Sequence, residues 1–214
     1  MPDETRTPPS RDPAVKSAEL DYFKQIPWCA GLLSRPGTKV WHPFSRRLNP
    51  PLGDGTFFKT LNTPDAIPAF LMFYNPPTAT GAGSASPTAS TSPPTPLSSL
   101  AATELSALVA LGDGVTGHPG IAHGGFLTAI LDEVLGNVAT ANREAGVIRG
   151  AYMTVSLNTT YLAPVRTPGA VLVTSHIVRQ DGRKLLLAGT IKDGDGKVLA
   201  KGEGLFLRVG KSQL

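Results

Sequence analysis

The sequence predicts an α+β fold in which a curved antiparallel β-sheet wraps around one long buried helix. Three observations lead to this prediction. Residues 126–141 are rich in helix formers and are apolar at the i, i+3, i+4, i+7 spacing, on more than one stripe. Two apolar runs precede this helix. Three strand candidates then follow residues 152–162 in close succession, and Asp-Gly turns separate them.

The first element is an N-terminal extension, which we place at residues 1–67. Residues 12–24 have a helical composition, in which Asp12 can cap the helix and Pro13 suits its first turn. Residues 25–66 carry many glycines and prolines and show no clear period. They predict an irregular wrap over the domain that follows.

Two buried strands are predicted before the helix, at residues 69–75 and 105–111. Residues 76–99 between them contain no charge, no aromatic ring and almost no large apolar side chain. Such a segment cannot bury enough surface to offset its ordering entropy, and we expect it to be disordered. Because the cost of closing a loop grows slowly with its length, the two strands can still form a hairpin. We therefore expect one domain over residues 68–209 and a short tail at 210–214.

After the helix, residues 152–162 alternate as a half-buried strand does. Met153, Val155 and Leu157 lie on its more apolar face, and Thr154 lies on the opposite face. We expect the helix to pack on the apolar face. The remaining strands of the predicted meander are residues 170–179, 184–192 and 198–209.

Composition argues against several classes of function. The net charge of +4 comes from twenty scattered Lys and Arg residues without a nucleic-acid motif. Such a mildly basic chain suits an anionic small ligand about as well as it suits nucleic acid. No segment approaches the ~20 apolar residues of a membrane span. The N-terminus resembles neither a signal peptide nor a convincing transit peptide. The default expectation is the cytoplasm, with mitochondria as the alternative.

Cysteine and histidine usage argues against metal and disulfide chemistry. The single cysteine, Cys29, excludes an internal disulfide and is expected to be a small, partly buried apolar residue. His42, His118 and His176 are widely spaced and share no ligand pattern, so we expect no metal site.

The most informative motif is His123-Gly124-Gly125, followed nine residues after the histidine by Asp132 inside the apolar helix. A carboxylate in a buried helix must be neutralised or hydrogen-bonded. The two glycines leave bare backbone N–H groups at the positive end of the helix. Amides that polarise a carbonyl, with an acid on the following turns, are suited to acyl transfer.

This order of elements resembles the hotdog-fold acyl-CoA thioesterases, most closely the branch with the phenylacetate-degradation thioesterases and the animal thioesterase-superfamily-member proteins. The family pattern of His-Gly-Gly, six residues and Asp matches from His123 to Asp132. The run from Thr154 to Tyr161, with Pro164 soon after, is similar to the family's strand after the helix. One departure is Gly117, where many relatives carry Asn or Gln.

The resemblance implies hydrolysis of an acyl-CoA thioester to a free carboxylic acid and coenzyme A. It implies no cofactor apart from the coenzyme A of the substrate, and a homodimer or a dimer of dimers. In the resembling family the helix acid and the strand hydroxyl meet across a dimer interface. Since Thr154 is expected on the face away from its own helix, we predict that Asp132 meets the Thr154 of a neighbouring chain.

Each candidate residue has an expected role in this chemistry. Asp132 is the general base or the direct nucleophile, and Thr154 orients water toward it. The amides of Gly124 and Gly125 are the oxyanion donors, and His123 supports the turn or the substrate.

The neighbouring charged residues have weaker assignments. Glu133 is expected to reach the surface or a subunit contact, because it points ~100° around the helix from Asp132. Arg183 and Lys184 lie at a turn where this family often meets the phosphates of coenzyme A.

Simpler interpretations of the same residues stay open at this point. Asp132 could be a buried acid satisfied by backbone amides, the glycines could serve close packing, and Thr154 could serve strand propensity. A hotdog module that binds acyl-CoA or a partner protein without turnover is one alternative function. A dehydratase or hydratase is the other, and it would require a catalytic His123.

Overall fold

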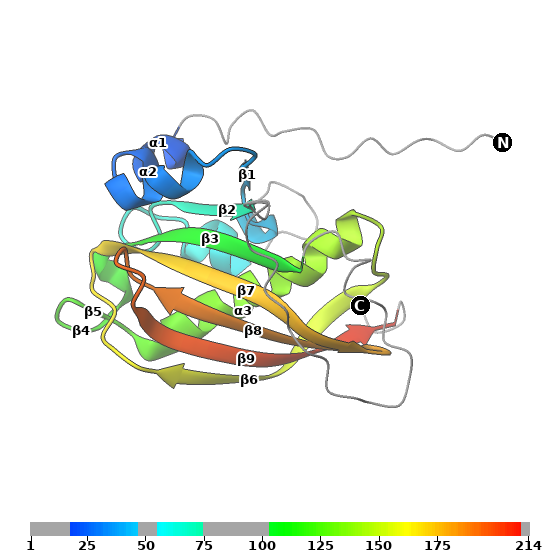
Figure 1. The fold of residues 1–214 in the computed structure, drawn as a ribbon. Helices are drawn as coiled ribbons and strands as arrows, with labels where there is room; N and C mark the ends of the chain where they lie inside the picture. The colour runs from blue at the N-terminus through cyan, green and yellow to red at the C-terminus, as the bar shows by residue number, and fades with distance from the viewer. Residues whose placement is uncertain (1–17, 47–54, 75–102, 211–214) are drawn as a thin grey trace.

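The computed structural model describes residues 18–46, 55–74 and 103–210. Seven antiparallel strands form one sheet in the order β1-β2-β3-β7-β8-β9-β6, and this sheet curves around helix α3, Gly124–Glu144 (Figure 1). The strands are β1 Lys39–Trp41, β2 Phe70–Tyr74, β3 Glu104–Leu111, β6 Ala151–Tyr161, β7 Gly169–Asp181, β8 Lys184–Lys192 and β9 Val198–Val209. The predicted α+β architecture is confirmed.

The core lies between α3 and the concave face of the sheet. The helix residues that face the sheet are large, apolar and fully buried, as the two-stripe pattern predicts: Ile130, Leu131, Val134, Leu135 and Val138. A glycine on β9 lets the helix approach closely, because a Cβ atom at Gly202 would lie 3.2 Å from Leu131 Cδ1. No helix in the described part of the chain is long and apolar enough to cross a membrane.

The predicted strands are found nearly where expected. The hairpin of β2 and β3 is confirmed, since the two strands pair antiparallel with Phe73 opposite Ser106. The meander of β7, β8 and β9 is also confirmed. The segment at residues 76–99, which was expected to be disordered, lies outside the described residues. Residues 211–214 of the tail expected at 210–214 lie outside them too.

The expected alternation of β6 is wrong. Met153 and Val155 were assigned to the helix-facing side, yet they are 51% and 58% exposed. The register of β6 against β9 shifts between Thr154 and Ser156. This bulge inserts one extra residue at Val155, and an inserted residue exchanges the two faces of a strand. Before the bulge Thr154 therefore faces the helix, and after it the odd-numbered side chains do.

The N-terminal extension is more regular than expected. Helix α1, Ala18–Lys24, confirms the end of the predicted helix at 12–24, whose first residues lie outside the described range. The predicted irregular wrap is wrong in part, because it contains helix α2, Pro27–Leu33, and strand β1, which pairs with β2. Elements of seven and three residues are too short to show a period in the sequence.

The two short helices cover the outer face of the sheet beside β2 and β3 (Figure 1). Phe23 of α1 and Cys29 of α2 are fully buried against Leu71, Phe73 and Leu108. Burial raises the pKa of the Cys29 thiol to about 12. Cys29 is thus a packing residue, as the sequence predicts.

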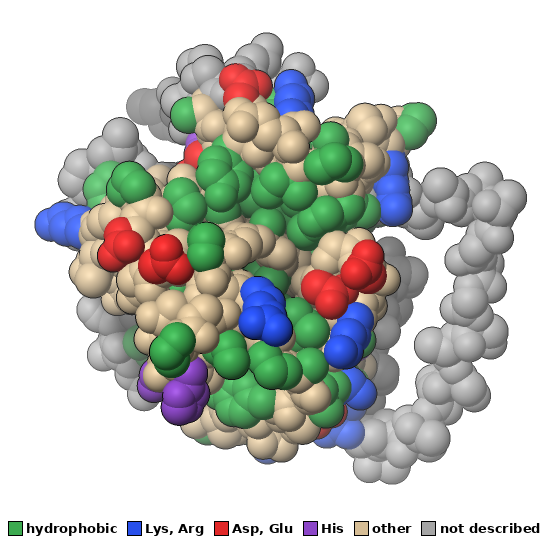
Figure 2. Space-filling view, turned by 90° about the vertical axis from the view of Figure 1, so that its left-hand side faces the viewer, with side chains coloured by type: hydrophobic (Ala, Val, Ile, Leu, Met, Phe, Trp, Pro, Cys, Tyr) green, Lys and Arg blue, Asp and Glu red, His purple; other side chains and the backbone are tan. Residues whose placement is uncertain are grey.

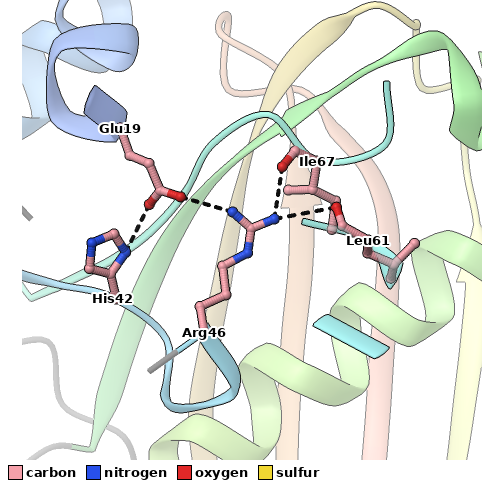
Figure 3. A network of polar contacts seen from close by, with 5 residues as sticks. All are labelled: Glu19, His42, Arg46, Leu61 and Ile67. Atoms are coloured by element: carbon pink, nitrogen blue, oxygen red, sulfur yellow. Dashed lines mark hydrogen bonds and ion pairs between the residues drawn. The ribbon is translucent and has the colours of Figure 1, made fainter. Parts of the chain in front are cut away.

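A buried arginine anchors the extension (Figure 3). Arg46 pairs through Nη1 with Glu19 Oε1 at 2.8 Å, and its Nη2 donates to the Ile67 carbonyl at 2.7 Å. Glu19 also pairs with His42 Nδ1 at 2.8 Å. Burial lowers the pKa of Arg46, and the negative charges of Glu19 and Glu133 oppose that shift. The network joins α1, the loop after β1 and the segment that leads into β2.

A small hairpin that the sequence did not predict precedes α3. It consists of β4, Thr116–His118, and β5, Ile121–Ala122. The N–H of His123 donates to the Val115 carbonyl at 2.9 Å. This bond closes the hairpin onto the first residue of the glycine motif and fixes where α3 begins.

Candidate functional site

The glycine motif forms the amino end of α3. His123 is the N-cap residue, with an extended backbone, and its Nδ1 accepts a hydrogen bond from the Gly125 N–H at 3.0 Å. A side chain that accepts from an amide of the first turn is the usual way to cap a helix. The Gly124 N–H finds no acceptor among the described residues. One of the two expected oxyanion donors is thus capped, and the other is open.

The departure at Gly117 has a steric explanation. A Cβ atom at Gly117 would lie 2.9 Å from the Cα atom of His123 and 3.0 Å from its ring. Contacts of this length to backbone are essentially never seen for real Cβ atoms. The amide side chain that many relatives carry at this position therefore has no room in this chain.

A tyrosine holds the amino-terminal half of α3 against β6. Tyr161 donates from its hydroxyl to the Gly124 carbonyl at 2.8 Å, and the same hydroxyl lies 2.7 Å from Thr128 Oγ1. Thr128 also donates to Thr159 Oγ1 at 3.2 Å. These hydrogen bonds join the first two turns of the helix to the strand.

Asp132 and Thr154 meet within one chain. The Thr154 hydroxyl donates to Asp132 Oδ1 at 2.7 Å, and Asp132 is half-buried. The expectation that these residues can meet only across two chains is wrong. It rested on strict alternation in β6, and the bulge at Val155 turns Thr154 toward its own helix.

The acid and the amides do not meet within one chain. Gly124 and Asp132 are separated by about 12 Å along the helix axis, at 1.5 Å per residue. A carbonyl carbon must lie ~3 Å from the attacking group while its oxygen lies within hydrogen-bond distance of the donor. Within one chain, Asp132 and the Gly124 amide are therefore two separate parts of the candidate site.

Glu133 points to the extension, and the expectation that it reaches the surface or a subunit contact is not met within the chain. Its Oε1 accepts from Ser45 Oγ at 2.6 Å and from Asn137 Nδ2 at 2.7 Å. The Phe44 N–H donates to Asn137 Oδ1 at 3.2 Å. The neighbour of Asp132 thus helps to bind the extension to α3.

A cavity of ≈ 640 Å³ adjoins Asp132 and Thr154. It runs beside the carboxyl-terminal half of α3, and residues of the extension and of β6 complete its wall. We call it the α3 groove. Besides Asp132 and Thr154, the α3 groove is lined by Phe44, Ser45, Gly136, Asn137, Thr140, Arg143, Glu144, Tyr152 and Phe206, among others. Sequence reasoning singled out none of these additional residues, since no motif marks them.

Arg183 and Lys184 are exposed at the turn between β7 and β8. The Arg208 N–H donates to the Arg183 carbonyl at 2.8 Å, so this turn lies at the end of the sheet where β9 ends and β6 begins. Helix α3 also ends on this side (Figure 1). The structure does not place Arg183 or Lys184 in contact with Asp132.

Charged side chains lie at both ends of the molecule. Lys and Arg side chains are interspersed with acidic and hydrophobic side chains on the end shown in Figure 2, where β4 and β5 lie. The opposite end also carries both signs of charge: Arg143, Arg149, Arg183, Lys184 and Arg208 lie there together with Glu144 and Asp181. Within the described ranges, no three His, Cys, Asp or Glu side chains come together in a way that could hold a metal ion.

Comparison with known proteins places the chain in a family. A model of the Thioesterase superfamily matches residues 119–200, from the turn before α3 into β9. Verlamelin biosynthesis protein B of a Lecanicillium species is 33% identical over 211 residues, which cover 85% of this chain and 84% of that protein. The chain belongs to the thioesterase superfamily. Its sheet around a central helix is the hotdog fold of that superfamily, and the resemblance to this superfamily is confirmed.

Two further similarities are partial. The acyl-coenzyme A thioesterase THEM4 of Mus musculus is 34% identical over 94 residues, which are 44% of this chain. The alignment spans 38% of the length of THEM4. A thioesterase superfamily protein of known crystal structure is 35% identical, covers 49% of each chain and superposes with a TM-score of 0.43.

Proposed function

We propose that this protein is an acyl-CoA thioesterase, with Asp132 as the group that activates water. The observation that carries the proposal is the 2.7 Å bond from Thr154 to Asp132 beside an open groove. Because the hydroxyl donates one hydrogen bond to Oδ1, Oδ2 of the carboxylate is available to a water molecule. Membership of the superfamily supports thioester chemistry, and the partial similarity to an acyl-CoA thioesterase supports the substrate class.

The reaction balances with water as the only second reactant. Asp132 takes a proton from water as the water oxygen bonds to the thioester carbonyl carbon. The tetrahedral intermediate collapses when the carbon–sulfur bond breaks. The thiolate of coenzyme A leaves, takes up a proton, and the acyl group departs as a carboxylic acid. In an alternative form of the same proposal, Asp132 attacks the carbonyl carbon itself, and water then hydrolyses the anhydride.

The developing oxyanion needs a donor that the same chain does not supply. The open N–H of Gly124 lies about 12 Å from Asp132 along the helix. We therefore propose that the working unit is a homodimer in which the Gly124 amide of one chain serves the Asp132 of the other. Strand β6 is at the edge of the described sheet, so its outer edge can pair with a second copy.

His123 has a positioning role in this proposal. Its Nδ1 accepts from Gly125 and so shapes the turn that presents the Gly124 amide. This occupation of Nδ1 favours the thioesterase over a dehydratase, in which the histidine itself would exchange protons with the substrate.

The experiment that tests the proposal is a panel of acyl-CoA substrates of different chain lengths, with detection of the free thiol. We expect stoichiometric release of coenzyme A and carboxylic acid from at least one class of acyl group. Thiol release that is absent for every substrate, from a folded protein, would overturn the proposal. Binding of acyl-CoA without release would then support the non-catalytic alternative.

A further inference from the structure

The second carboxylate of α3, Glu133, is bound to the N-terminal extension. Its Oε1 accepts from Ser45 Oγ at 2.6 Å and from Asn137 Nδ2 at 2.7 Å. The buried Asn137 also donates to the Glu133 carbonyl at 2.8 Å, and its Oδ1 accepts from the Phe44 N–H at 3.2 Å. One glutamate and one asparagine of the helix thus connect two consecutive residues of the extension to the helix turn that carries Asp132.

This turn of α3, residues 132–137, contains a glycine, and we call it the acid turn. Glycine has more backbone freedom than any other residue, and inside a helix it costs about 1 kcal/mol relative to alanine. At Gly136 there is no side chain to pack, although a Cβ atom would make only an ordinary contact of 3.8 Å with Phe206 Cε1. The position of Asp132 therefore depends more on the bonds that other elements make to the acid turn.

Two elements make such bonds. From β6, Thr154 donates to Asp132 Oδ1 at 2.7 Å, and from the extension, Ser45 donates to Glu133. Because Asp132 and Glu133 are consecutive, their side chains point about 100° apart around the helix. The strand and the extension thus hold the acid turn from different directions.

The loop that carries Ser45 is itself fixed by the neighbouring Arg46. The Arg46 side chain is 2% exposed and is hydrogen-bonded to Glu19 Oε1 at 2.8 Å and to the Ile67 carbonyl at 2.7 Å. The charges of Arg46 and Glu133 attract each other. The extension therefore presents Ser45 to the acid turn from a loop that is anchored at three points (Figure 3).

We infer that Glu133 and Ser45 are positioning residues for Asp132, and that the N-terminal extension is part of the catalytic unit through them. The inference rests on the proposed function. A displacement of about 1 Å in a reacting group can cost 10²-fold in rate, so the holding of the acid turn matters for turnover. Ser45 lies outside residues 119–200, which the superfamily model matches.

The first test compares two substitutions of Glu133. Glu133→Ala should lower kcat about tenfold with little change in KM, because it frees the acid turn from the extension. Glu133→Gln should recover most of this loss, since the amide oxygen of glutamine accepts from Ser45 and Asn137 as the carboxylate does. Equal losses in both variants would show that the charge of Glu133 is needed for the chemistry, and would overturn the positioning role.

The second test removes the partner of Glu133 in the extension. Ser45→Ala should lower kcat about fivefold, again with little change in KM, because a single hydrogen bond to the acid turn is lost. Ser34→Ala is the matched control, since the exposed Ser34 hydroxyl bonds locally to the Gly31 carbonyl at 3.3 Å. It should change neither quantity. A wild-type kcat in Ser45→Ala would overturn the inference.

Repeating Ser45→Ala in the Asp132→Asn background separates positioning from a merely structural role. If Ser45 acts through the acid, its substitution should leave the small residual turnover of Asp132→Asn unchanged. A loss by the same factor in both backgrounds would mean that Ser45→Ala damages the protein in general, and would overturn the inference.

Failure of the proposed function has a different signature. Hydrogen exchange of the α3 amides needs no substrate, and Ser45→Ala should accelerate it in the acid turn while Ser34→Ala does not. If the wild-type protein hydrolyses no thioester, faster exchange in Ser45→Ala would show that the extension holds the acid turn although the hydrolase assignment fails. Unchanged exchange would overturn the inference as well.

Discussion

The two halves of α3 meet strand β6 in different ways. In the amino-terminal half, Tyr161 and Thr159 are hydrogen-bonded to the first turns of the helix. In the carboxyl-terminal half, Thr154 bonds to Asp132, and a groove continues beyond them over Gly136. The bulge at Val155 is the boundary between the halves. The part of β6 that follows the bulge is thus hydrogen-bonded to the helix. The part of β6 that precedes the bulge forms a wall of the candidate site.

This difference teaches that the two ends of the candidate site have different physical requirements. An oxyanion donor is useful only when it is fixed, and the contacts of Tyr161 fix the amino end of α3. A substrate can reach Asp132 only if the space beside it is open, and the other half of the helix has Gly136 where a larger side chain would fit. The predictions below test whether the two halves work together, and from which chains.

The largest expected effect is at the open half. Asp132→Asn should lose nearly all turnover, on the order of 10²–10⁴-fold in kcat, because the amide cannot take a proton from water. The fold should persist, since the amide oxygen still accepts from Thr154 and the volume is almost the same. Steady-state kinetics and circular dichroism measure the two quantities. A wild-type rate in this variant would make Asp132 structural.

The next largest effect is at the amino-terminal half of α3. Gly124→Pro removes the N–H of the first helical residue, and proline suits this position. The extended backbone of His123 is also the conformation that a residue before proline prefers. We expect a loss of about 10²–10³-fold in kcat, the usual value of one oxyanion donor.

Gly124→Ala is the matched control for the proline variant. It adds the same Cβ atom, which would lie 3.1 Å from the Tyr161 ring in either variant, and it keeps the N–H. Kinetics of the two proteins side by side separate the amide from the added volume. Equal losses in both would show that crowding against Tyr161, and not a missing donor, is responsible.

Mixing inactive chains sharpens the comparison further. Chains with Asp132→Asn and chains with Gly124→Pro should recover about a quarter of wild-type activity after random exchange into twofold dimers, because each heterodimer keeps one intact site. Chains with Asp132→Asn and chains with Thr154→Ala should recover nothing, since the acid and the hydroxyl come from the same chain. Native mass spectrometry confirms the exchange. The opposite pattern would refute the assignment of donors to chains.

The smallest expected effect concerns the segment between β2 and β3. Replacing residues 76–99 with a short Gly-Ser turn should leave the melting temperature and kcat close to wild type. Phe73 and Ser106 are paired at the open end of the hairpin, so a short connection can join the strands. Differential scanning calorimetry makes the comparison. A drop of many degrees would show that this segment contributes to the folded domain.

The main elements of the fold could be predicted because their signals are local. The apolar period of α3 and the Asp-Gly turns of the meander can both be recognised from short runs of consecutive residues. The bulge in β6 has no such local signal. It can be recognised only when the residues of β6 are aligned with those of the partner strand β9. Strict alternation therefore put Thr154 on the wrong face and led to the wrong conclusion about which chains meet.

In the candidate site, too, the residues that form a local motif could be predicted, and the others could not. His123, Gly124, Gly125 and Asp132 stand in one motif, and the sequence identifies them together. Tyr152 and Gly136 are single residues that the fold brings to the lining of the α3 groove. The contacts of Glu133 depend on Ser45, which lies 88 residues earlier in the chain. No local pattern contains such information.

The hydrogen bonds between the N-terminal extension and α3 have a consequence for how the residues of this site change in evolution. Ser45 and Phe44 bond to Glu133 and Asn137, and Arg46 in turn secures this loop beneath α1. A graft of the helix and the strands alone onto another hotdog scaffold would leave Glu133 without its serine partner and one side of the groove without a wall. The two parts should therefore vary together among descendants of this chain, and substitutions at Ser45 should be accompanied by substitutions at Glu133.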